Sequence, residues 1–141
     1  DGDSIFNYSL AGYPSEYTHL TMDPEGHLWF SNFYGQIFRF KNGVIELFID
    51  RSAETNVSIS FDLSYYPKVL ITDEKSVLTA TLTQNNVTIE TLFEAAEVFP
   101  CAGVDYPLFL TKHSKNQFSI LRVDPQLKTT TIGELEINRP L

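Results

Sequence analysis

The chain has 141 residues, of which 43% are hydrophobic and 20% charged, a composition that fits one folded domain with a modest core and excludes a disordered chain. Its 10 Lys and Arg against 18 Asp and Glu give a net charge of −8 without a basic cluster, which argues against a nucleic-acid partner because phosphate backbones are bound mainly by basic side chains. No stretch approaches the roughly 18 apolar residues of a membrane-spanning helix, so we expect no direct membrane insertion.

Residues 1–16 are expected to hold a strand of a preceding unit followed by a linker. Residues 1–4 have neither the basic nor the apolar region of a secretory signal, which indicates a mature or trimmed chain. Residues 5–8 fall one period before residues 44–48, the fourth strand expected in the first unit.

Residues 17–50 are predicted to form four short strands, because apolar and β-branched runs alternate with turn residues. The runs are 18–23, 28–30, 36–40 and 44–48. Between the first two, Asp23 can accept hydrogen bonds from the following turn while Gly26 takes a positive φ, which is a hairpin signal. Gly35 and the pair Asn42-Gly43 mark the next two tight turns.

Two further units, residues 51–93 and 94–137, repeat this pattern. Segment 36–40 aligns with 76–80 at an offset of 40 residues and with 117–121 at a further 41. Helix competes with strand only at residues 92–98, a run too short for more than a turn of helix. The sequence therefore holds three units of about 40 residues with four strands each.

A period of 40 to 45 residues with four strands is the signature of a β-propeller blade. The second strand of every unit is a continuous apolar triplet, as expected where a sheet is covered on both faces. We therefore predict an all-β chain, a β-propeller fragment of about three four-stranded antiparallel blades plus one N-terminal strand. The structural alternative is an immunoglobulin-like sandwich, which has about seven strands and no reason to repeat at this period.

One string in the first unit carries a family resemblance. The residues are Asp23, Gly26, Leu28, Trp29, Gly35, Ile37, Arg39 and Phe40. Their spacing resembles the propeller repeat of two-component-regulator sensors, the periplasmic input domains of bacterial hybrid histidine kinases. The resemblance is close over about 25 residues only, since the other two units lack the Trp and the Asp-x-x-Gly. It implies a periplasmic or extracellular location and a role in signal sensing.

Within this string, Asp23, Gly26, Trp29, Gly35 and Arg39 are interpreted as structural residues. Trp29 is the only tryptophan, and we expect it to be buried as packing between blades.

The sequence offers little catalytic chemistry. His19, His27 and His113 do not stand at metal-ligand spacing with another His, Cys or carboxylate, so no metal or cofactor is expected. The single cysteine, Cys101, lies in an apolar run and is predicted to be a buried core residue. With no nucleophile elbow either, we expect no enzyme activity in this fragment.

The candidate ligand-binding residues lie in two loops of the first unit, because propellers place ligands at strand ends around the axis. They are Tyr13, Glu16, Tyr17, Asn32, Phe33 and Tyr34. Aromatic rings with polar neighbours could stack on a sugar and bond its hydroxyls, which points to a glycan or another small ligand. The alternative is that these aromatic residues cover neighbouring blades.

The leading functional hypothesis is a non-catalytic ligand-sensing or binding module, part of an extracytoplasmic sensor propeller of a two-component signalling protein. The alternatives are a structural or interaction propeller of a cell-surface or secretion-associated protein and, less favoured, a propeller lyase or lactonase. Three blades cannot close a ring of four to eight. We therefore expect the chain to associate, either as a homo-oligomer or with the rest of a larger propeller.

Overall fold

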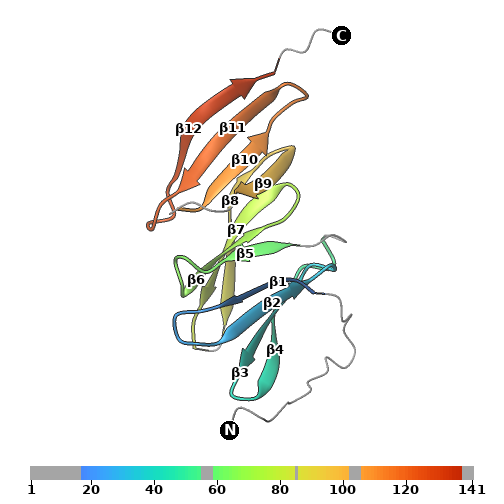
Figure 1. The fold of residues 1–141 in the computed structure, drawn as a ribbon, viewed down its shortest axis with the longest axis vertical. Coiled ribbons are helices and arrows are strands. Elements are labelled where there is room, and N and C mark those ends of the chain that lie inside the picture. The colour runs from blue at the N-terminus through green and yellow to red at the C-terminus, as the bar shows by residue number, and fades with distance from the viewer. Residues whose placement is uncertain (1–16, 55–58, 85, 102–105, 138–141) are drawn as a thin grey trace, which may run out of the picture.

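The computed structural model describes residues 17–54, 59–84, 86–101 and 106–137. Within these residues the chain is all-β and has twelve strands (Figure 1). The strands are β1 (Tyr17–Met22), β2 (Leu28–Asn32), β3 (Gln36–Lys41), β4 (Val44–Asp50), β5 (Ser60–Asp62), β6 (Lys68–Thr72), β7 (Ser76–Leu82), β8 (Val87–Glu94), β9 (Glu97–Cys101), β10 (Leu108–Lys112), β11 (Gln117–Val123) and β12 (Thr129–Glu136).

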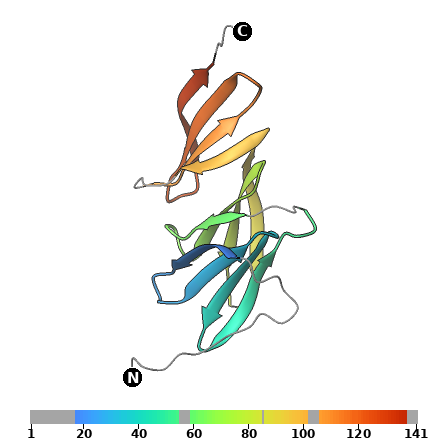
Figure 2. The ribbon, with the colours of Figure 1, turned by 45° about the vertical axis from the view of Figure 1, so that its right-hand side comes forward.

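The strands form three four-stranded antiparallel sheets, each made of four strands consecutive in sequence. The first sheet is β1–β4, the second β5–β8 and the third β9–β12. They follow one another along the long axis of the molecule (Figures 1 and 2). The predicted three four-stranded sheets are confirmed, and the two-sheet sandwich is wrong for the described residues. The predicted N-terminal strand at residues 5–8 lies outside them.

The turn signals of the first unit act as predicted. Gly26 and Gly35 have φ of 87° and 79°, and the Asn42-Gly43 turn between β3 and β4 has φ of 51° and 77°. Such positive values at both central residues are those of a type I′ hairpin, whose twist matches that of the flanking strands. These glycines therefore fix the register of the first sheet.

An apolar core joins the first sheet to the second. Trp29 and Ile37 of the first sheet are fully buried against Phe61, Val69 and Ile71 of the second. The edge of the Phe48 ring packs on Trp29, with centroids 4.6 Å apart. The burial of Trp29 confirms its predicted packing role.

A second core joins the second sheet to the third. Leu70 and Val77, whose side chains point away from the first sheet, pack with Val98, Phe109 and Val123. Because β6 alternates between the two cores, with Val69 and Ile71 in one and Leu70 in the other, the second sheet is buried on both faces. This explains the continuous apolar triplet in β6.

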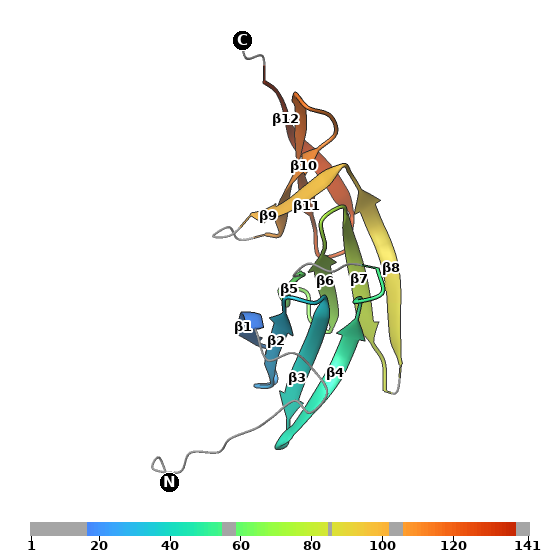
Figure 3. The ribbon, with the colours of Figure 1, turned by 90° about the vertical axis from the view of Figure 1, so that its right-hand side faces the viewer.

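The two junctions are not identical. At the first, β1 lies beside β5, whereas at the second, β9 lies beside β6 and β7 (Figure 3). The third sheet is therefore placed differently on the second than the second is on the first.

Ile37, Val77 and Phe118 occupy the same position in their sheets. Each forms the last register pair before the turn between the second and third strands. Ile37 and Val77 are fully buried because each faces the next sheet, whereas Phe118 on the third sheet is half-buried.

The structure differs from two predictions made for residues 92–101. Residues 92–98 contain no helical turn, since β8 runs to Glu94 and β9 begins at Glu97. The prediction that Cys101 is buried is wrong, because Cys101 is exposed. β9 is an edge strand of the third sheet, where Pro100 is also tolerated, and its one buried side chain is Val98.

Candidate functional site

One edge of the molecule collects the turns between the second and third strands and the connections between sheets. We call it the first rim, made of residues 33–35, 51–54, 73–75, 95–96 and 113–116. The amide of Arg51 donates to the carbonyl of Gly35, and the Arg51 guanidinium lies 3.4 Å from the Asp73 carboxylate. The first rim is thereby continuous from the first sheet to the second.

The same edge is continued to the third sheet by backbone hydrogen bonds. The amide of Ala95 donates to the carbonyl of Lys75, and the amide of Val98 donates to the carbonyl of Glu74, both at 2.8 Å. The amide of Ala96 donates to the carbonyl of Lys112 at 3.0 Å. The side chains of this edge are therefore held on a backbone fixed in all three sheets.

Two of the predicted ligand-binding residues, Phe33 and Tyr34, lie exposed at the tip of the β2–β3 turn. The side chain of Asn32, the last residue of β2, is fully buried. Its Oδ1 accepts hydrogen bonds from the amides of Tyr34 and Gln36, and its Nδ2 donates to the Gln36 side chain at 2.7 Å. Asn32 therefore holds the turn that presents the two aromatic rings and does not itself belong to the exposed surface.

Of the other three predicted ligand residues, the structure describes only Tyr17. Tyr13 and Glu16 lie outside the described residues, and Tyr17 is described only as the first residue of β1. Phe33 and Tyr34 are therefore the part of this prediction that the structure brings together.

The first rim also holds an acidic recess of about 350 Å³ at the β6–β7 turn, flanked by the β4–β5 connection and by the end of β8. Its charged lining residues are Glu54, Asp73, Glu74, Lys75 and Glu94. Glu74 and Lys75 also line a neighbouring recess of about 340 Å³ beside β9. Carboxylate acceptors with a single ammonium donor can bond the hydroxyl groups of a neutral ligand.

These rim charges were missed at the level of sequence. Asp73 and Glu74 lie in a short turn, where carboxylates are ordinarily solvated, and nothing local in the sequence links them to Arg51 or Glu54. The equivalent turn of the first unit, residues 33–35, holds no charged residue, so the repeat gives no signal for them either.

Asp50, at the end of β4, anchors the start of the first connection. The Ser52 hydroxyl and amide and the Gln36 side chain all donate to its carboxylate. Hydrogen bonds from Ser52, opposed by burial and aided by Gln36, lower the pKa of Asp50 below the ordinary carboxyl value. The carboxylate is therefore held ionised at the base of the first rim.

The opposite edge carries the Asp-x-x-Gly turn between β1 and β2. Asp23 is buried, and its Oδ1 accepts from the amides of Glu25 and His27 while its Oδ2 accepts from the Trp29 indole at 2.8 Å. Burial raises the pKa of Asp23, but the hydrogen bonds from Trp29, His27 and Glu25 and the charge of His27 outweigh it, so the pKa is lowered. Asp23 is therefore structural.

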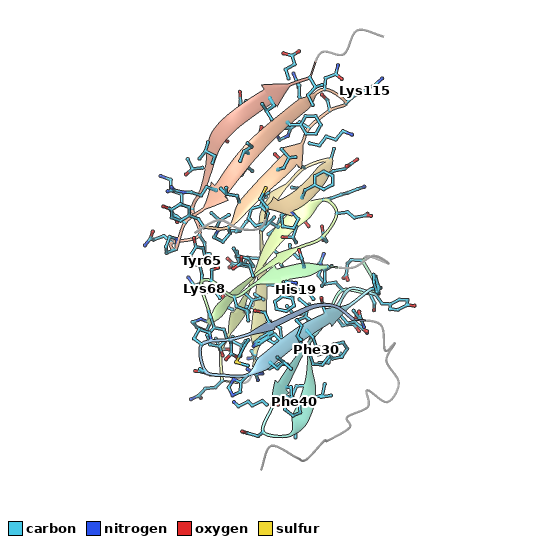
Figure 4. All side chains as sticks on the ribbon, viewed as in Figure 1. His19, Phe30, Phe40, Tyr65, Lys68 and Lys115 are labelled. Carbon is cyan, nitrogen blue, oxygen red and sulfur yellow. The ribbon has the colours of Figure 1, made fainter. Side chains whose placement is uncertain are left out.

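Two adjacent tyrosines between β5 and β6 tie this second edge together. The Tyr66 hydroxyl donates to Glu25 of the first sheet at 3.2 Å, and the Tyr65 hydroxyl donates to the Val123 carbonyl of the third sheet at 2.6 Å. Figure 4 places Tyr65 at the boundary between the second and third sheets. Both hydroxyls are used for contacts between sheets.

A third recess, of about 450 Å³, lies where β1 and β5 run side by side. His19, which is labelled in Figure 4, lines it together with Thr21, Asp62 and Ser64. The ring of His19 meets that of Phe61 edge-on, with centroids 4.6 Å apart.

The remaining polar cluster is at the β10–β11 turn. His113 Nε2 lies 2.9 Å from the Ser119 hydroxyl and 3.2 Å from the Thr111 hydroxyl. Among the described residues, no group of three His, Cys, Asp or Glu side chains is placed to hold a metal ion. The described part of the chain also contains no helix long and apolar enough to cross a membrane.

Comparison of the chain with protein-family models, with curated proteins and with solved structures gives no match.

Proposed function

We propose that this chain is a run of three β-propeller blades that acts as a non-catalytic ligand-binding module. In this proposal it belongs to an extracytoplasmic sensor of the two-component type, and its ligand is a glycan or another small hydroxyl-bearing molecule bound at the first rim.

The burial of the second sheet on both faces is the observation that carries this proposal. Four-stranded meanders that follow one another in sequence and pack face to face are the construction of a propeller. The order of the two cores, with Ile37 facing forward from the first sheet and Val77 facing forward from the second, supports a repeated unit.

The ligand part is supported by the first rim. Phe33 and Tyr34 stand exposed on a turn that is hydrogen-bonded to the Asn32 side chain, and aromatic rings presented in this way are suited to stacking on a sugar. The acidic recess on the same rim offers acceptors for hydroxyl groups. The extracytoplasmic sensor role is supported by the family resemblance of the string from Asp23 to Phe40.

Titration calorimetry with neutral trisaccharides, namely cellotriose, xylotriose and mannotriose, tests the ligand part. We expect at least one to bind, and Phe33→Ala or Tyr34→Ala to weaken that binding about tenfold, the effect of losing one well-placed aromatic contact. Val44→Ala is the matched control, because Val44 is an exposed apolar residue at the β3–β4 turn on the opposite edge. Binding by none of the three sugars at millimolar concentration, or an equal loss in the control, contradicts the ligand proposal.

A further inference from the structure

The third sheet has an apolar face turned away from the second sheet. Phe99, Leu110 and Ile120 form one row across three strands, and Phe118 pairs with Leu135 in the next row. We call these five residues the outer face of the third sheet. Phe99 and Leu135 are 45% and 52% exposed. With four strands about 4.8 Å apart and about five residues each, the whole face covers on the order of 300 Å² in projection, and the five apolar residues occupy part of it.

The chain itself indicates what covers such a face. The outer face of the third sheet contains Phe118, the counterpart of Ile37 and Val77. Inside the molecule, the faces of Ile37 and Val77 are each covered by the opposite face of the following sheet. A matching occupant for the third sheet is therefore the rear face of another sheet of this kind.

A second copy of this chain carries such a rear face on its first sheet. Leu20, Met22 and Leu47 lie on the side of that sheet opposite Trp29 and are exposed, Leu20 and Met22 by 65% and 61%. The strand registers place only apolar side chains beside them in these rows. An apolar rear face is thus available at the other end of the same chain.

We propose that two copies of the chain associate head to tail, with the outer face of the third sheet of each packed on the Leu20, Met22 and Leu47 face of the other. This inference rests on the proposed function, because the number of copies comes from propeller closure. Three sheets per copy give six with two copies, within the usual four to eight, whereas three copies would exceed it. The interface is heterologous and occurs twice.

The charges on the interface are compatible with this packing. Lys112 and Glu97, at the rim end of the outer face, lie 3.7 Å apart and pair with each other. Each copy carries a net charge of −8, so repulsion between copies opposes association and is screened by salt.

Size-exclusion chromatography with light scattering tests the proposal on the 141-residue chain at tens of micromolar and moderate salt. We expect a mass twice the 16.0 kDa of one chain. Leu20→Asp and Phe99→Asp each block one of the two faces, and we expect each alone to raise the dimer dissociation constant at least tenfold. Ile89→Asp, at a site 44% exposed on β8 of the second sheet, is the matched control and should leave the mass at that of a dimer.

An equimolar mixture of the two blocked variants separates head-to-tail packing from its alternatives. Leu20→Asp keeps its third-sheet face and Phe99→Asp keeps its first-sheet face, so one intact junction can form and a dimer should reappear. Circular dichroism of each variant checks that it is folded, and Met22→Asp replaces Leu20→Asp if the latter is not.

Three results would overturn the proposal: a monomeric wild-type chain, a dimer broken by Phe99→Asp but not by a first-sheet variant, or species larger than two copies. A monomer that still binds a trisaccharide removes this inference alone. A dimer that binds none of the sugars removes the ligand proposal alone.

Discussion

The indole Nε1 of Trp29 donates a 2.8 Å hydrogen bond to the carboxylate of Asp23, and both side chains are buried. The bond joins the first hairpin turn to the core between the first and second sheets. One residue pair therefore connects the local turn of the Asp-x-x-Gly string to the packing of one sheet on the next.

Trp29→Ala should lower the free energy of unfolding by about 3–5 kcal/mol, because it empties the centre of the first core and leaves Asp23 without its indole donor. Chemical denaturation followed by circular dichroism measures this change. Phe33→Ala, at an exposed aromatic residue, should change stability by no more than about 0.5 kcal/mol. Similar losses for both variants would show that Trp29 has no special packing role.

Asp23→Asn should destabilise the chain by about 1–3 kcal/mol, since the amide cannot accept at both positions and buried donors lose their partner. The folded pKa of Asp23 lies below its ordinary value of 3.8. Its ionisation therefore stabilises the fold fully above that value, and this contribution is lost as the pH falls through the folded pKa.

The pH dependence of denaturation checks this sign. The wild-type chain should lose stability as the pH falls below about 4, and Asp23→Asn should lose less over the same range. Asp50, whose pKa is also lowered, remains in the variant, so some acid sensitivity should persist. A variant with the full acid sensitivity of the wild type would refute the role given to Asp23.

Gly26→Ala should destabilise the chain by about 1–2 kcal/mol, because a φ of 87° is strained for a residue with a Cβ even though open space surrounds the site. Gly133→Ala is the matched control. Its φ is not positive and its nearest neighbour, Ile120 Cδ1, lies 3.7 Å from the added methyl, so it should be neutral or slightly stabilising. The reverse order of thermal midpoints would contradict the assigned turn.

The two adjacent tyrosines should differ in their effect. Tyr65→Phe leaves the partly buried Val123 carbonyl without its donor and should cost about 1 kcal/mol. Tyr66→Phe removes an exposed hydrogen bond to Glu25 and should cost no more than about 0.5 kcal/mol. Equal costs in urea denaturation would show that Tyr65 does not tie the second sheet to the third.

The fold could be predicted further than the site because its signals are local and repeated. The apolar triplet containing Val69, Leu70 and Ile71 and the turns at Gly26 and Asn42-Gly43 each act within a few residues. The exposure of Cys101 could not be predicted in this way. An apolar run is equally consistent with a strand covered on both faces and with an edge strand at the end of the stack.

The site depends on contacts distant in sequence. Arg51 meets Asp73 across 22 residues, and Glu54 joins Glu94 in one recess only through the packing of the sheets. The sequence assigns Asn32 to the ligand surface because it stands in a predicted loop at a strand end, whereas the structure makes it the buried last residue of β2. The exposure of Phe33 and Tyr34 could be predicted, because the sequence places both residues at the tip of a turn.

A crystal structure of the chain is the most direct test of the central claim, that three like sheets follow one another as consecutive blades with the second covered on both faces. When the three sheets are overlaid, Ile37, Val77 and Phe118 should superpose, with Trp29 and Ile71 in one core and Leu70 and Phe109 in the other. A sandwich of two sheets, or a second sheet with one face open to solvent, would contradict the account.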